Sequence, residues 1–346
     1  MINIKDSLQY DKDGMLGILE KFPEEAKEAY TKFKTMRLPS AYKNPDNIFI
    51  CAVGGSAIGG DLFKIYLTHR SEIPVIVNRS NYIPKFVNSN TLSILISYSG
   101  MTKEVLNCFD ELKKRDSKII ILTSGGTLQE LAVRYYLPCV NLKTGKPSRT
   151  AMGEILYSLL GIFEQLPSLI IKKEDVLESL SVLHSLQTQL CLSCSPDKNV
   201  AMQMAKHLTD KTPVILGITN LTDAVALRWK NQFNENSKKT AFNYFFPEIT
   251  HNDIVNLSLN DYPDWQVIVL RDFEETPLIT RQINLTTGLL CGHVSGISEL
   301  SGQGNNLLSR QMSLAYFGDY VTVYLALLKG INPTPIQPIQ NLKQML

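Results

Sequence analysis

The chain has 346 residues, of which 44% are hydrophobic and 20% are charged, and its formal net charge is +2. This length is sufficient for two hydrophobic cores, so two domains are expected. Positive and negative charges are mixed without a long basic run, which argues against a nucleic-acid partner and favours a small substrate. No apolar run reaches the ~18 residues that span a bilayer, and the first residues lack a signal-peptide pattern. We therefore expect a cytoplasmic protein with no membrane partner.

The six cysteines are scattered along the chain, as is typical where thiols stay reduced. Cys191 and Cys194 form a C-x-x-C pair, but no second pair or suitably spaced histidine completes a four-ligand zinc site. We interpret the pair as two small residues on a helix, and we expect no metal.

The first part of the chain, residues 1–40, is charged and has a helix-type pattern, which predicts a leader that packs onto a domain. From Asn47 onward, short β-branched apolar runs alternate with turn and helix signals. These runs predict strands over residues 48–53, 74–78, 92–98 and 118–124. Strands that alternate with helices form a parallel sheet that is covered on both faces.

A second series of strands follows two predicted helices at residues 154–165 and 174–192. Its strands are expected at residues 212–219, 239–245, 264–272 and 294–297. The fold class is therefore α/β, with two successive domains. We place the leader and the first sheet in residues 1–190, and the second sheet with a C-terminal tail in residues 191–346.

Three loops rich in glycine or hydroxyl groups follow strands of the first sheet, at residues 54–60, 97–102 and 123–127. Ligands of open α/β sheets bind beyond the carboxyl ends of the strands, where helix amides can hold an anion. The first loop does not fit G-x-G-x-x-G, and Asn78-Arg79 stands where NAD binding needs an acidic residue. Each loop alone is also explained by helix capping. Their joint appearance favours a site for a phosphate monoester.

The second of these loops resembles the S-x-S-G-x-T loop of the sugar isomerase (SIS) domain, through Ser97, Ser99, Gly100 and Thr102. Five further segments carry a second similarity: Arg149 to Gly153, Asn234-Glu235-Asn236, Pro247-Glu248 with His251-Asn252, Gly318-Asp319-Tyr320, and Asn332 to Pro335. They resemble motifs of the bifunctional phosphoglucose/phosphomannose isomerases, and this similarity covers the chain from Asn47 to the C-terminus.

The resemblance implies two SIS domains, each a parallel sheet flanked by helices, and a sugar-phosphate site in the cleft between them. It also implies that no metal or organic cofactor takes part. The implied phosphate-binding residues are Gly55, Ser56, Ser97, Ser99 and Thr102.

The resemblance assigns the chemical roles as well. Glu235 would be the base that moves a proton between C1 and C2 through a cis-enediol, and Arg149 would stabilise the enediolate. His251 and Lys343 would open the sugar ring, since histidine titrates near neutral pH and can act as acid or base. A solvated helix-face carboxylate is the other reading of Glu235. The resemblance further implies a homodimer in which His251 comes from the neighbouring subunit.

The expected activity is interconversion of glucose 6-phosphate, and of mannose 6-phosphate, with fructose 6-phosphate. Two alternatives stay open: an isomerase of another sugar phosphate, and a SIS sensor that binds without turnover. A sensor that regulates transcription would carry a helix-turn-helix, which is not evident. A glucosamine-phosphate synthase-like transferase would need a glutaminase domain with a leading cysteine, and we do not expect one. Met101 replaces the family's usual asparagine, and we expect it to alter affinity more than activity.

Overall fold

The computed structural model of the chain describes residues 7–345, so the first six residues of the predicted leader lie outside the described residues. The chain forms two compact units. Lys21–Leu180 make up the first-sheet unit, and the second-sheet unit runs from Ser181 onward and includes the chain up to Glu20. The units divide helix α7 (Lys173–Leu190) between Leu180 and Ser181. The limits expected from the sequence, 1–190 and 191–346, stay a prediction.

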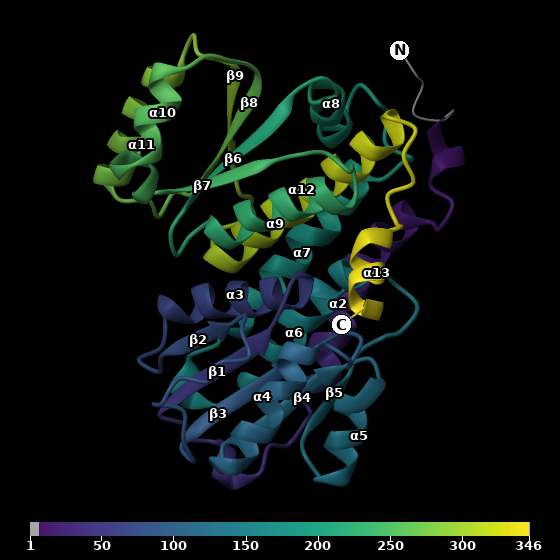
Figure 1. The fold of residues 1–346 in the computed structure, drawn as a ribbon, viewed down its shortest axis with the longest axis vertical. Helices are drawn as coiled ribbons and strands as arrows, with labels where there is room; N and C mark the ends of the chain where they lie inside the picture. Colours follow the sequence, from purple (N-terminus) through teal and green to yellow (C-terminus); the bar gives the residue numbers. More distant parts are fainter. Residues whose placement is uncertain (1–6, 346) are drawn as a thin grey trace. The chain divides into compact units, whose positions relative to one another are not determined.

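The first-sheet unit contains a five-stranded parallel sheet in the order β2-β1-β3-β4-β5 (Figure 1). Its central strands are almost wholly buried, as expected for apolar runs that are covered on both faces. All four strands predicted here are present. The strands are β1 (Asn47–Ala52), β2 (Val75–Asn78), β3 (Thr91–Ile96), β4 (Lys118–Thr123) and the unpredicted β5 (Cys139–Asn141).

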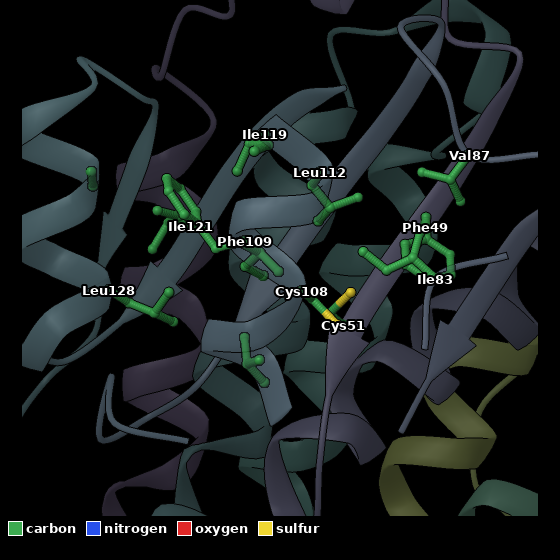
Figure 2. Packing of buried hydrophobic residues seen from close by; sticks show 13 residues of the cluster. Phe49, Cys51, Ile83, Val87, Cys108, Phe109, Leu112, Ile119, Ile121 and Leu128 are labelled. Atoms are coloured by element: carbon green, nitrogen blue, oxygen red, sulfur yellow. The ribbon is translucent and has the colours of Figure 1, made fainter. Parts of the chain in front are cut away.

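Helices cover both faces of this sheet. On one face, α4 (Lys103–Lys114) and α5 (Gly126–Arg134) pack with Phe49 and Cys51 of β1 in a buried cluster (Figure 2). The sulfur atoms of Cys51 and Cys108 lie side by side in this cluster (Figure 2). On the other face, α3 (Gly55–Thr68) packs against α6 (Met152–Phe163), and every residue of α6 is buried. An all-round apolar helix of this kind belongs inside a core.

Shorter elements complete the first-sheet unit. Helix α2 (Met15–Phe33) continues across the limit at Glu20, which gives the helix predicted in the leader. The 3-10 helices are η2 (Ser40–Tyr42), η3 (Ser148–Ala151) and η4 (Pro167–Leu169). Among them, η3 carries the segment that resembles the arginine motif of the family.

The second-sheet unit contains a four-stranded parallel sheet in the order β7-β6-β8-β9. All four strands predicted for it are present, and α9 (Asp223–Glu235) packs on β6. Helix α12 (Leu307–Leu328) packs on α9 and is buried along nearly its whole length. The remaining elements are η1 (Leu8–Tyr10), α8 (Val200–His207), β6 (Thr212–Ile218), β7 (Phe242–Phe246), η5 (Glu248–His251), α10 (Asp253–Leu259), β8 (Tyr262–Arg271), α11 (Pro277–Leu290), β9 (Val294–Ser301) and α13 (Gln337–Met345).

The predicted fold class is confirmed, because each unit is a parallel sheet flanked by helices. One local prediction is wrong: Cys191 and Cys194 lie in turns after the end of α7, not on a helix. The helix ends at Leu190, whose carbonyl oxygen accepts hydrogen bonds from the Tyr324 hydroxyl at 2.6 Å and from Asn199 Nδ2 at 2.9 Å. These two bonds, one from nine positions and one from 134 positions further along the chain, satisfy the last carbonyl of the helix.

Two features of the described residues bear on the expected partners. Within residues 7–345, no helix has both the length and the apolar character needed to cross a membrane. The same part of the chain holds no group of three or more histidine, cysteine, aspartate or glutamate side chains placed to bind a metal ion.

Candidate active site

The candidate phosphate loops share one edge of the first sheet. Strands β1, β3 and β4 are neighbours and run parallel, so their carboxyl ends meet at the same edge. The loop after each strand leads into a helix, and these helices are α3, α4 and α5 respectively. The first-turn amide groups of a helix carry partial positive charge, so this edge is suited to an anion.

The loop after β1 is short and leads directly into α3. Gly54 caps the helix with a φ of +58°, a left-handed conformation that favours glycine. Gly55 is the first residue of α3, and the buried Ser56 follows in the first turn. This loop therefore offers helix amides and one hydroxyl group at the edge of the sheet.

The loop after β3 holds a pair of hydroxyl groups in contact. Ser97 is 1% exposed, and its Oγ lies 2.7 Å from Oγ1 of Thr102, the N-cap residue of α4. Ser99 is exposed, and its Oγ accepts a hydrogen bond from the Met101 amide at 3.3 Å. The three hydroxyl-bearing residues of the predicted S-x-S-G-x-T loop thus gather at the start of one helix.

The loop after β4 supports the second loop. Ser124 donates hydrogen bonds from both its amide and its hydroxyl to the carbonyl oxygen of Tyr98, at 2.9 and 2.6 Å. Gly100 is packed so tightly that a β-carbon there would lie 1.8 Å from the Gly125 carbonyl oxygen. The Met101 sulfur accepts contacts from the amide and hydroxyl of Thr127, at 3.5 and 3.4 Å. Met101 therefore lies over the start of α5, and the loop after β4 stabilises the loop after β3 through these contacts.

Arg149 lies in η3, directly beside the first loop. Arg149 is 2% exposed, and a β-carbon at Gly55 would come within 2.9 Å of the Arg149 Cα. The first turn of α3 and η3 therefore pack backbone to backbone, as the contacts between these two elements also show. The structure brings the backbone of Arg149 into contact with a predicted phosphate loop, although the two positions are far apart in the sequence.

Glu235 is the last residue of α9 in the second-sheet unit, and it is half-buried. The two residues that follow it are buried: Asn236 Nδ2 donates to the Thr322 hydroxyl at 3.0 Å, and the Ser237 hydroxyl donates to the Thr322 carbonyl at 2.7 Å. Lys238 Nζ donates to the Glu235 carbonyl at 2.6 Å. The backbone that carries the glutamate is thus fixed from its C-terminal side.

The two residues predicted to open the sugar ring are exposed in the same unit. His251 ends η5, just before α10, and Lys343 lies in α13. The ring-opening roles of His251 and Lys343 stay predictions. The phosphate loops with Arg149 belong to the first-sheet unit, whereas Glu235, His251 and Lys343 belong to the second-sheet unit.

Two residues near the phosphate loops were missed by reasoning from the sequence. Tyr98 stands between Ser97 and Ser99, and its hydroxyl contacts the segment that leads to Arg149. Lys146 in that segment has a side chain only 6% exposed. The sequence feature that could have indicated Tyr98 is its place as an aromatic residue between two serines of the loop. Nothing local indicated that the lysine is buried.

Comparison with protein families defines the class. A model of the SIS domain matches residues 41–139, and a model described as the bacterial phospho-glucose isomerase C-terminal SIS domain matches residues 197–346. Among solved structures, the fold is similar to that of a hypothetical protein from Thermus thermophilus, with a TM-score of 0.75 and 14% identity. That alignment covers 99% of this chain and 92% of the other. The chain is therefore a two-domain SIS protein.

Relatives narrow the class to one family. The bifunctional phosphoglucose/phosphomannose isomerase of Caldicellulosiruptor bescii is 35% identical, over 94% of this chain and 96% of the relative. The enzyme of the same name from Thermoplasma acidophilum is 32% identical, over 87% and 89% respectively. The chain belongs to the bifunctional phosphoglucose/phosphomannose isomerase family, as the sequence motifs predicted.

Proposed function

We propose that this chain interconverts glucose 6-phosphate, and mannose 6-phosphate, with fructose 6-phosphate, in the cytoplasm and without a cofactor. The observation that carries the proposal is the packing of Arg149 against Gly55. This contact lies at the same edge of the first sheet as the hydroxyl-rich loop that leads into α4. An isomerase of phosphorylated aldoses needs a cation, because negative charge develops on the sugar oxygens. This packing brings the backbone of an arginine next to the first phosphate loop.

The phosphate group binds at the starts of α3 and α4 in this proposal. Ser56, Ser97, Ser99 and Thr102 donate hydroxyl hydrogen bonds to its oxygens, and the amide of Gly55 adds a backbone donor. Hydrogen bonds to an ionised group are stronger than those between neutral groups. The helix amides add partial positive charge at the same place.

Ring opening and proton transfer then follow at the other end of the sugar. His251 and Lys343 move protons at O1 and at the ring oxygen, which yields the open-chain sugar. Glu235 removes a proton from C2 of the aldose and returns it at C1, or the reverse, through a cis-enediol. Arg149 stabilises the charge on the enediolate oxygens.

The active form in this proposal is a homodimer, in which His251 acts in the site of the neighbouring subunit. Closed twofold dimers are the commonest symmetric assembly, and each would hold two equivalent sites. We also propose that the domains divide near residue 190 and that the leader belongs with the first domain in function.

The experiment is an assay of fructose 6-phosphate formation from glucose 6-phosphate and, separately, from mannose 6-phosphate, with a metal chelator present. Turnover of both substrates is expected. Loss of turnover in chelator would contradict the cofactor-independent mechanism. Binding of either sugar phosphate by calorimetry without any turnover would support the sensor instead, and failure on both counts would direct the search to other sugar phosphates.

A further inference from the structure

Tyr98 connects the hydroxyl-rich loop to the segment that carries Arg149. Its hydroxyl donates to the Lys143 carbonyl at 2.8 Å and accepts from the Lys146 amide at 3.4 Å. Its own carbonyl accepts the two bonds from Ser124. One residue therefore holds the loop after β4 through its backbone and the Arg149 segment through its side chain.

The segment that receives the tyrosine is anchored by buried charges. Lys146 Nζ lies 3.1 Å from Glu154 of α6 and is also paired with Glu25 of α2. The other oxygen of Glu154 accepts the Lys143 amide at 2.7 Å. Burial raises the pKa of the Tyr98 hydroxyl, so the group stays protonated and remains a donor near neutral pH.

Little freedom remains between this anchor and Arg149. Pro147 follows Lys146 with φ at −60°, and its carbonyl accepts the Thr150 amide at 2.9 Å and the Thr150 hydroxyl at 2.8 Å. The next residues form η3, whose Arg149 packs on Gly55. A displacement of the backbone at Lys146 would therefore also displace Arg149.

We propose that Tyr98 is a positioning residue, which sets the place of Arg149 relative to the phosphate held by the loop around Ser97 and Ser99. The proposal rests on the proposed function. Binding of the phosphate by the loop and stabilisation of the enediolate by Arg149 occur at opposite ends of the sugar, so the distance between the two must be fixed. A misplacement of about 1 Å costs about 100-fold in rate in well-ordered sites.

The test is Tyr98→Phe, which removes only the hydroxyl and so leaves the packing of the ring. We expect kcat to fall about tenfold, because Arg149 acts in the transition state, with KM changed less than about threefold, because the phosphate hydroxyls remain. Tyr136→Phe is the matched control: it makes the same change on the same unit at an exposed residue, and it should leave both constants unchanged.

A double-mutant cycle separates positioning from a general structural effect. If Tyr98 acts through Arg149, Tyr98→Phe should cause little further loss in an Arg149→Ala background. If the losses of kcat from Tyr98→Phe and Arg149→Ala multiply in the double variant, the proposal is overturned. An unchanged kcat in Tyr98→Phe alone would also overturn it.

Hydrogen–deuterium exchange gives a readout that does not depend on activity. Amides in peptides covering residues 143–151 should exchange faster in Tyr98→Phe than in wild type or Tyr136→Phe, because the Lys146 amide loses its acceptor. Sorbitol 6-phosphate, which has no carbonyl group, should slow exchange in this segment in the wild type more than in Tyr98→Phe. Equal exchange in all three proteins would refute the link. A wild type without turnover would refute the proposed function, and the exchange data would still decide on Tyr98.

Discussion

Arg228 of α9 and Asp319 of α12 form a buried pair with two hydrogen bonds, Nε to Oδ1 at 2.9 Å and Nη2 to Oδ2 at 2.6 Å. Gln232 Nε2 donates to the same Oδ1 at 2.9 Å. Arg228 and Asp319 are 2% and 1% exposed. These bonds fix α9 to α12 just before the last turn of α9, which ends at Glu235. Asp319, a residue of the G-D-Y motif, therefore helps to hold the candidate base in place.

Asp319→Asn should lower the free energy of unfolding by about 3–5 kcal/mol, because it removes the carboxylate that pairs with the buried Arg228. Urea unfolding followed by tryptophan fluorescence measures the change, since both tryptophans lie in the second-sheet unit. Asp261→Asn is the control, because its pair with His293 is exposed and such pairs contribute at most about 1 kcal/mol. Equal effects of both changes would contradict the assigned role.

Gly55→Ala should reduce kcat/KM about tenfold or more. The new β-carbon would lie 2.9 Å from the Arg149 Cα, which is backbone, so either η3 or the first turn of α3 must move. Gly17→Ala is the control, since nothing lies within 4 Å of a β-carbon there. Steady-state kinetics of the two variants would decide, and an unaffected Gly55→Ala enzyme would mean that this contact does not matter for the site.

The double variant Ser97→Ala/Ser99→Ala should raise KM for the sugar phosphate while the fold survives. Each hydrogen bond to the phosphate dianion contributes about 1.5–3 kcal/mol. Michaelis constants measured beside a thermal unfolding curve make the comparison. If KM stays at the wild-type value, the serines serve only to start α4, and the phosphate binds elsewhere.

Glu235→Gln should reduce kcat by about 10²–10⁴-fold with little change in KM, because it removes the general base but keeps the side chain's shape. In heavy water the wild type should incorporate deuterium at C2 of glucose 6-phosphate or C1 of fructose 6-phosphate, and the variant should not. Mass spectrometry of the sugars measures the label. Near-normal exchange by the variant would direct attention to Glu248 as the base.

Mixing two inactive variants tests whether His251 acts across a dimer. Glu235→Gln and His251→Asn are unfolded together and refolded at equal concentration. A mixed dimer in which the histidine acts across the interface keeps one intact site, so activity should return to about a quarter of wild type. Each variant refolded alone is the control. A mixture that stays inactive would exclude a histidine contributed in trans.

The strands could be predicted from the sequence where burial on both faces leaves an unbroken apolar run, as in β3 and β4. Strand β5 could not, because three residues with a single buried side chain, Val140, have no detectable pattern. The end of α7 was also missed. The carbonyl of its last residue, Leu190, accepts a hydrogen bond from Tyr324, 134 positions away, and no residue pattern near Leu190 indicates that bond.

In the candidate site, too, features that are local in the sequence could be predicted, and contacts between residues far apart in the sequence could not. The hydroxyl groups of Ser97, Ser99 and Thr102 could be predicted because a phosphate loop is local in the sequence. The bond between Tyr98 and Lys146 joins residues 48 positions apart. The contact of Gly55 with Arg149 joins two different elements, α3 and η3. Which residues pack around a loop depends on the tertiary fold, which residue patterns do not specify.

The first turns of α2 belong to the second-sheet unit, where the Leu19 carbonyl accepts the hydroxyl of Tyr316 at 2.7 Å and the Glu20 carbonyl accepts Gln187. Along the chain, Lys21–Leu180 is therefore an insertion within the other unit. Because domains fold as units while the ribosome extends the chain, the inserted part can fold first. The start of α2 precedes the inserted part along the chain but must wait for α12, so it is made before that part and packed after it.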